Sequence, residues 1–309
     1  RQRTKRASTV RKVIFMGYLY LLLALTGGLI KGFTGKRVSN DVHTLKDCLF
    51  VNFLRVLFCA LISAGFLLAE SCVEFALPTG KHLLFYCFSA LCMASFCVVF
   101  MFGYKTAAYM YLSIFGMLGS VMTGVLGSVI YHEAMGWNKL LGMAVLVLAV
   151  VIMSKCNKSV THVSTRKVLP LLCLAAISVT LSDFSQKIFV YEIGGSAAEY
   201  NFYTYGFSTL LLLPSFLLAK GSLREGNAPL LHGRHVALCF VIAASLFMNS
   251  YSKTLAARFL TAAEIYPVLQ GANLIASALL ARILLKEKIT PRCIAGMLTA
   301  FVGIIIMNL

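Results

Sequence analysis

The chain has 309 residues, of which 59% are hydrophobic and only 13% are charged. Soluble domains carry roughly a quarter charged residues, so this composition excludes an ordinary soluble protein. The formal net charge of +17 would favour nucleic-acid binding in a soluble chain. Here Lys and Arg lie mostly beside apolar runs, where they contact lipid headgroups. We therefore expect membrane lipid, and no nucleic acid, among the partners.

A basic tail at residues 1–12 precedes a series of apolar runs. The runs are about 17 to 25 residues long, and a helix of about 20 residues crosses the hydrocarbon core of a bilayer. Backbone polar groups in lipid must be satisfied within the segment, so the runs predict helices rather than strands. In chain order the expected spans are 13–33, 46–69, 82–104, 107–131, 138–154, 168–191, 200–219, 234–252, 260–284 and 291–308. The sequence thus predicts an all-α integral membrane protein with ten transmembrane helices.

The cysteines and histidines give no sign of a metal site or of catalysis. Most of the ten cysteines lie inside apolar runs and none forms a CxxC pair, which is typical of cysteine used as a small apolar residue. The six histidines show no metal-ligand spacing such as HExxH. The sequence also lacks a P-loop, a nucleophile elbow and a dinucleotide fingerprint. We therefore expect no enzyme activity, no metal and no cofactor.

Several residues of the first half recur in the second half at a nearly constant distance. Glu133 recurs as Glu287 at an offset of 154 residues. Gly142 recurs as Gly296 at the same offset. Further matches at offsets of 149 to 156 are Asn52 with Asn201, Met153 with Met307, Thr106 with Thr261, and Lys31 with Lys187. Their shared order and similar offsets favour an internal duplication.

We therefore predict two five-helix repeats, at residues 13–155 and 156–309. Five is an odd number, so the second repeat is expected to be inverted in the membrane, as is common in secondary transporters. An even total of spans places both termini on one side. The six basic residues of the tail favour the cytosol for that side. Basic residues near 155–167 and 282–292 would lie on the opposite side, so the charge count alone leaves the orientation open.

Three motifs follow one another in order along nearly the whole chain. They are Asn-Phe-Leu-Arg at 52–55, Thr-Ala-Ala at 106–108 and 261–263 with Pro267 after the second, and Glu133…Gly142 with Glu287…Gly296. In these motifs the chain resembles the drug/metabolite transporters of the EamA type. It departs from them at Gly116, near the place of a proline, and at Tyr203 and Thr204, where an arginine is expected. The resemblance implies ten helices that transport a small metabolite, and it does not choose between amino acids, purines, sugars, nucleotide sugars and organic phosphates. It also favours cytosolic termini.

Charged residues inside the spans are costly and are therefore candidates for function. Lys31 and Lys105 are predicted to reach one mouth of the pathway, and Lys187 and Lys253 the other. The alternative for these lysines is that they snorkel to lipid headgroups. Arg55 lies about a third of the way into its span and is expected to face inward, toward a partner or a wet cavity.

Two acidic residues are expected at the level of the second lysine pair. Asp183 lies four residues before Lys187, so the two share a helix face. Glu264 opens the ninth span on the same side. We predict that these residues and Lys253 form a gate, and the alternative is an ion pair that locks the helices structurally. Glu133 is expected to make only a local cap or pair, as is its counterpart Glu287.

Uncharged polar residues gather on the eighth and ninth spans. Tyr266 and Gln270 lie one turn apart and are the best candidates for substrate contacts near the midplane. Asn249 and Asn273 lie on the same two spans, and plain helix packing is the alternative for the small and polar stripes there. The complete set of predicted substrate-binding residues is Tyr266, Gln270, Asn273, Asn249, Arg55, Lys31, Lys105, Lys187 and Lys253.

These features together predict a secondary transporter that moves a small metabolite by alternating access, driven by a gradient or by exchange. The alternatives are a membrane channel, a membrane-embedded scaffold without transport activity, and a membrane-embedded enzyme. Cationic residues outnumber acidic ones along the predicted pathway. This surplus favours a small-molecule substrate that is anionic or zwitterionic. Homodimerisation is left open.

Overall fold

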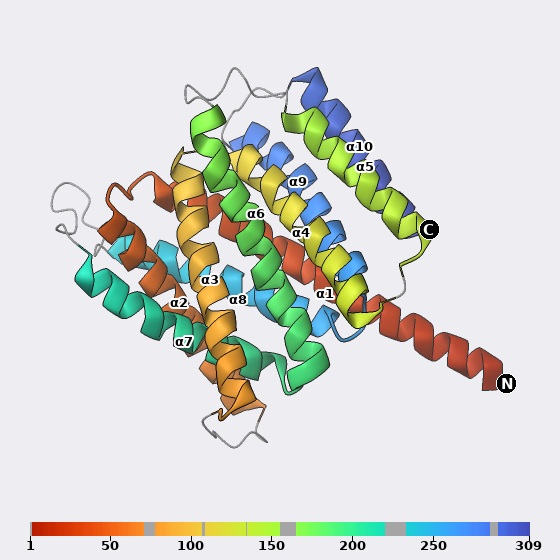
Figure 1. Cartoon of the computed structure of the whole chain (residues 1–309), viewed down its shortest axis with the longest axis horizontal. Helices are drawn as coiled ribbons and strands as arrows, with labels where there is room; N and C mark the ends of the chain where they lie inside the picture. Colours follow the sequence, from red (N-terminus) through yellow and green to blue (C-terminus); the bar gives the residue numbers. More distant parts are fainter. Residues whose placement is uncertain are drawn as a thin grey trace.

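The computed structural model describes residues 2–70, 78–106, 109–133, 135–154, 165–219, 233–284 and 290–309. In this part of the chain there are ten α-helices, one short π-helix and no strand (Figure 1). The helices are α1 (Gln2–Ser39), α2 (Leu45–Ala69), α3 (Lys81–Thr106), α4 (Tyr109–Tyr131), α5 (Trp137–Ser154), α6 (Thr165–Ile188), α7 (Ala197–Leu218), α8 (Gly233–Ala256), α9 (Ala262–Leu284) and α10 (Pro291–Met307), and the π-helix Phe189–Ile193 continues α6. The predicted all-helical fold is confirmed.

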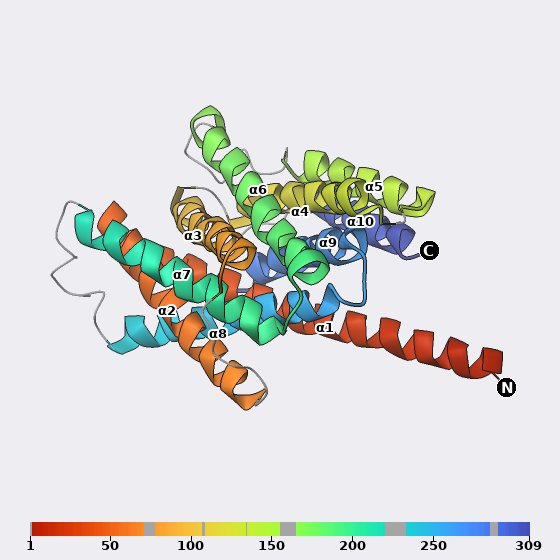
Figure 2. The ribbon, with the colours of Figure 1, turned by 60° about the horizontal axis from the view of Figure 1, so that its bottom comes forward.

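Each predicted span coincides with one of these helices, and most ends agree within a few residues. The largest difference is at α1, which begins at Gln2 and therefore includes most of the predicted basic tail. This first part of α1 extends beyond the rest of the molecule in both views (Figures 1 and 2).

Six helical segments of the described residues are long and apolar enough to cross a membrane. They are Phe15–Ser39, Leu45–Ala69, Lys81–Lys105, Leu112–Tyr131, Leu169–Ile193 and Gly233–Ala256. Trp137–Met153 and Ile294–Met307 are apolar but shorter. Large apolar side chains such as Leu84 of α3, Leu148 of α5 and Leu298 of α10 are exposed, and an apolar surface of this extent suits contact with lipid. The molecule is thus built as a multi-pass membrane protein.

The two halves of the molecule, α1–α5 and α6–α10, pack in equivalent ways. Three helices pack on their own counterparts, α2 on α7, α4 on α9 and α5 on α10. The contact of α1 with α8 has its equivalent in the contact of α6 with α3, and the contact of α2 with α8 in that of α7 with α3. Exchanging the halves therefore preserves the principal helix neighbours, as a two-fold relation requires.

The seam between α5 and α10 shows that the halves are inverted. Gly142, at the start of α5, lies against Met307 and the carbonyl oxygen of Gly303 at the end of α10. Correspondingly, Gly296, at the start of α10, lies against Met153 at the end of α5. The two helices are therefore antiparallel, and they lie side by side at one edge of the molecule (Figure 1). Both contacts repeat at the 154-residue offset, which confirms the predicted inverted repeat.

Counterpart helices α2 and α7 also begin with the same local signal. Thr44 caps α2 and accepts a hydrogen bond from the backbone N–H of Asp47, whose carboxylate accepts from the N–H of Thr44. Ser196 and Glu199 form the same capping box at the start of α7. These two helices pack on each other at one side of the molecule (Figure 1).

Candidate functional site

A cavity lies between α1, α3 and α4 of the first half and α6, α8 and α9 of the second half. It contains about 750 Å³ of empty space, part of which is open to solvent. The three helices from each half are counterparts of one another, so the cavity lies where the two repeats meet. This is the position of the substrate site in inverted-repeat transporters.

The cavity extends from Asp183 and Lys253, in the last turns of α6 and α8, toward one end of the bundle. Its lining includes Tyr104 near the end of α3 and Leu112 near the start of α4. On α9, the first described lining residue is Leu269, two turns inside the helix. We call one end of the bundle, at which α1 and α3 terminate, the open end. The other end, at which α4 and α6 terminate, is called the closed end.

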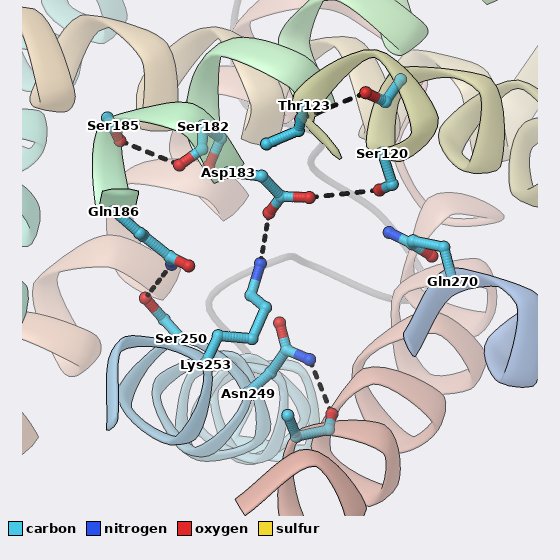
Figure 3. A network of polar contacts seen from close by, with 12 residues as sticks. Ser120, Thr123, Ser182, Asp183, Ser185, Gln186, Asn249, Ser250, Lys253 and Gln270 are labelled. Carbon is cyan, nitrogen blue, oxygen red and sulfur yellow. Dashed lines mark hydrogen bonds and ion pairs between the residues drawn. The ribbon is translucent and has the colours of Figure 1, made fainter. Parts of the chain in front are cut away.

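A buried ion pair between two neighbouring helices forms part of the cavity wall. Lys253 of α8 donates to Asp183 Oδ1 of α6 at 2.5 Å, and Ser120 of α4 donates to Asp183 Oδ2 at 3.2 Å (Figure 3). The ammonium group of Lys253 also lies 6.0 Å from the centre of the Tyr266 ring. Charges this far from water are tolerated only when they are paired and hydrogen-bonded. The pair therefore holds α6, α8 and α4 in this arrangement.

Lys31 of α1 is the second lysine in the cavity wall. Its ammonium group lies 5.0 Å from the centre of the Phe96 ring, which gives it a cation–π contact. Within the described part of the chain, it makes no ion pair with a carboxylate. Lys253 is paired with Asp183, so Lys31 is the basic side chain of the described lining that has no acidic partner.

Amide side chains from three helices complete the polar part of the wall. Asn249 donates to the carbonyl oxygen of Ala24 at 2.6 Å, and Gln186 donates to Ser250 at 3.1 Å (Figure 3). The oxygen atoms Gln186 Oε1 and Asn273 Oδ1 are buried and have no hydrogen-bond partner among the described residues. An unsatisfied buried acceptor is costly, so these two atoms favour a ligand that donates hydrogen bonds.

The closed end is held by a second buried ion pair that joins the two halves. Lys187 of α6 donates to Glu133 Oε1 at 2.7 Å and to the carbonyl oxygen of Leu260 at 3.0 Å. The other carboxylate oxygen of Glu133 accepts from the backbone N–H of Ala262 at 2.6 Å and so caps the start of α9. Glu133 therefore does not make the purely local contact that the sequence suggested. Its counterpart Glu287 lies outside the described residues.

A third ion pair lies at the same end and is more exposed. Lys139 at the start of α5 lies 2.9 Å from Glu264 Oε1 at the start of α9. The predicted four-residue gate is thus divided in this structure. Asp183 pairs with Lys253, whereas Lys187 and Glu264 each pair with a residue of the first half.

The predicted site residues fall into two groups. Those that line the cavity are Lys31, Asp183, Asn249, Lys253, Gln270 and Asn273. Those that do not are Arg55, Lys105, Lys187, Glu264 and Tyr266. The substrate roles of both groups stay predictions.

The residues of the second group have clear structural surroundings. Tyr266 is fully buried behind Lys253. Arg55 is buried, with its guanidinium 3.5 Å from Asn52 Oδ1. Lys105 is exposed at the open end and donates to the carbonyl oxygen of His43 at 3.0 Å.

The apolar wall of the cavity was not predicted from the sequence. Phe96, Phe100 and Tyr104 of α3 all line it, and we refer to these three residues as the aromatic face of α3. Their spacing of four residues places them on one side of the helix. That spacing was visible in the sequence, but aromatic residues are so frequent in membrane helices that it did not stand out.

Comparisons with known proteins agree with the motifs. The EamA-like transporter family matches residues 15–155 and, a second time, residues 166–309. A protein of known crystal structure superposes with a TM-score of 0.71 over 94% of this chain and 98% of its own, at 10% sequence identity, which is a likeness of fold. No curated protein sequence matches the chain. The family suggested by the sequence motifs is thus confirmed.

Proposed function

The chain belongs to the EamA-like transporter family, and we propose that it carries a small metabolite across a bilayer by alternating access. Membership of the family makes it a multi-pass membrane transporter of small molecules. The proposal adds that all ten helices cross the membrane, with both termini in the cytosol. It also holds that transport is driven by a gradient or by exchange and that the chain has no enzyme activity.

The one-sided cavity is the observation that carries this proposal. Its described lining begins near the open end, whereas two ion pairs between the halves hold the closed end together. An inverted repeat can reach the opposite state when its halves exchange their packing around a fixed site. In that state, Lys187 would part from Glu133 and the closed end would open.

The charge of the cavity wall supports an anionic or zwitterionic cargo. Lys31 supplies a positive charge that no described carboxylate in the wall neutralises. In a site of low dielectric constant, such a charge attracts a carboxylate or phosphate strongly. The Asp183–Lys253 pair is expected to act as the inner gate, because it joins α6 and α8 beside the substrate.

Counterflow in proteoliposomes tests the proposal. Purified protein is reconstituted, the vesicles are loaded with one unlabelled metabolite from a panel of carboxylates, amino acids, nucleosides and organic phosphates, and labelled uptake is measured. We expect saturable uptake that the internal metabolite accelerates, with no such uptake in protein-free vesicles. Flux that does not saturate and shows no counterflow would indicate a channel instead. Absence of flux for every member of the panel would favour a scaffold.

A further inference from the structure

We propose that the cargo is a flat aromatic monoanion, which places its ring against the aromatic face of α3 and its carboxylate at Lys31. This inference rests on the proposed function and names the class of substrate that the cavity selects. It follows from the different chemistry of the cavity's two walls, from the aromatic rings that one wall presents to the cavity, and from the lysine beside those rings.

The aromatic face of α3 offers a continuous surface to a ring. The centres of the Phe96 and Phe100 rings lie 4.3 Å apart, and those of Phe100 and Tyr104 lie 6.0 Å apart in an edge arrangement. Aromatic rings prefer tilted, offset or edge contacts of this kind with one another. A planar ring in the cargo could therefore add to the row without moving the helix.

Helix α4 approaches this surface closely at a glycine. A Cβ atom on Gly116 would lie 3.8 Å from the Phe100 ring and 3.9 Å from Val179, with no closer neighbour. A methyl group at this position would already be in van der Waals contact with the Phe100 ring. The absence of a side chain at Gly116 therefore leaves this part of the Phe100 ring uncovered toward the cavity, which both residues line.

Lys31 is the one charged side chain of the described lining that lies at the aromatic face without an acidic partner. Lys31 lies over the Phe96 ring, whereas Asp183 is already paired with Lys253 and hydrogen-bonded to Ser120. One negative charge on the cargo would balance the described wall. A second would remain uncompensated in a poorly hydrated site, where an unpaired charge is costly.

The opposite wall favours polar substituents on the ring. Helix α8 is the counterpart of α3, but it presents Asn249, Ser250 and Lys253 to the cavity instead of rings. The unpaired oxygen atoms of Gln186 and Asn273 lie on the neighbouring helices α6 and α9, and Gln270 points toward the same space (Figure 3). Hydroxyl or amino groups on the cargo's ring are therefore expected to strengthen binding.

Four probes of similar size test the contribution of the ring and that of the negative charge to binding separately. They are 3-phenylpropionate, hexanoate, 3-phenylpropan-1-ol and 3-phenylpropylamine. Each competes with labelled 3-phenylpropionate for the purified full-length protein in detergent, measured by equilibrium dialysis. We expect 3-phenylpropionate to bind more tightly than hexanoate and the alcohol, and the amine to bind least. Equal binding of hexanoate and 3-phenylpropionate would overturn the role of the ring, and tighter binding of the amine would overturn the role of the charge.

Substitutions test whether Lys31 causes the preference for a carboxylate and Phe100 the preference for a ring. Lys31→Gln should weaken 3-phenylpropionate about 10- to 100-fold and leave the alcohol unchanged. Phe100→Leu should weaken it about 3- to 10-fold and leave hexanoate unchanged. Phe88→Leu is the matched control, because Phe88 lies on the outward side of the same helix, and it should change neither. Should Phe100→Leu fail to fold, Gly116→Ala tests the same point, because its methyl group would cover part of the Phe100 ring and should weaken 3-phenylpropionate more than hexanoate.

The outcomes distinguish this inference from the proposed function. Counterflow of another metabolite that 3-phenylpropionate does not inhibit would refute the aromatic monoanion and leave the transporter intact. Binding of 3-phenylpropionate without counterflow of any metabolite would refute the transporter. Inhibition of metabolite counterflow by phosphatidylglycerol, with no inhibition by 3-phenylpropionate, would assign Lys31 to a lipid headgroup. That result would overturn the inference.

Discussion

Lys187 and Glu133 are the most completely buried charged pair described, with side-chain exposures of 0% and 2%. Removing one partner of a buried pair strands the other charge and typically costs about 3–5 kcal/mol. We therefore expect Lys187→Met to lower the free energy of unfolding by that amount, measured from thermal unfolding in detergent. In the double variant with Glu133→Gln, part of the loss should return because no charge is left unpaired.

The ion pair between Lys139 and Glu264 is the natural control. Its side chains are 17% and 24% exposed, and partly solvated pairs contribute about 1 kcal/mol or less. Lys139→Met should therefore lower stability much less than Lys187→Met. Equal losses in the two variants would show that burial does not set the strength of these pairs.

The polar residues could be recognised from the sequence, but their partners could not. Lys31, Asp183 and Lys253 stand out because charged residues are rare inside apolar runs. The helix spacing placed Asp183 and Lys187 on one face, where they were expected to form one cluster with Lys253 and Glu264. Instead, Asp183 pairs with Lys253 of α8, and Lys187 pairs with Glu133, which follows α4. Each buried charge thus finds its partner on another segment of the bundle. Such contacts depend on how the helices pack, which one sequence does not reveal.

The seam between α5 and α10 allows a prediction at the level of whole helices. A Cβ on Gly142 would lie 2.8 Å from the carbonyl oxygen of Gly303, and backbone cannot easily move aside. On Gly296 it would mainly overlap the flexible side chain of Met153. We expect Gly142→Ala to cost about 1–3 kcal/mol and Gly296→Ala to cost less, measured from thermal unfolding in detergent.

Gly65 of α2 is a suitable control for these substitutions. A Cβ there would meet no atom within 4 Å, and alanine is favoured over glycine inside a helix by about 0.5–1 kcal/mol. Gly65→Ala should thus be neutral or stabilising. A larger loss for Gly296→Ala than for Gly142→Ala would contradict the packing described for the seam.

Helices could be located from the sequence because the length of each apolar run reflects the thickness of a bilayer. Their ends were harder to place. The eighth span was expected to end at 252, before Lys253, yet α8 continues to Ala256. Since Asp183 neutralises Lys253, the helix can keep this lysine in its buried part. The end of a span thus depended on a partner 70 residues away.

At the scale of the whole molecule, alternating access requires the closed end to open. Cysteines introduced at Lys139 and Glu264 can be joined by a short bifunctional thiol reagent, since the native side chains are in contact. We expect the cross-link to stop counterflow, because α5 and α9 could no longer separate. Binding of cargo at the open end should persist, and reduction of the cross-link should restore transport.

The parent chain for this experiment should lack Cys87 and Cys173, the exposed cysteines of the described residues. Each single-cysteine variant, and the parent chain itself, should keep its transport after the same treatment. Continued counterflow in fully cross-linked protein would mean that the closed end does not open during transport.

The one-sided cavity also has a pharmacological consequence. A ligand that fills the cavity but is too large to be enclosed would bind only this state and draw the population toward it. It would then inhibit from one face of the membrane and be inert from the other. In vesicles that hold the protein in both orientations, a membrane-impermeant inhibitor of this kind would reach a plateau below full inhibition. The height of that plateau would report the fraction of molecules whose open end faces outward.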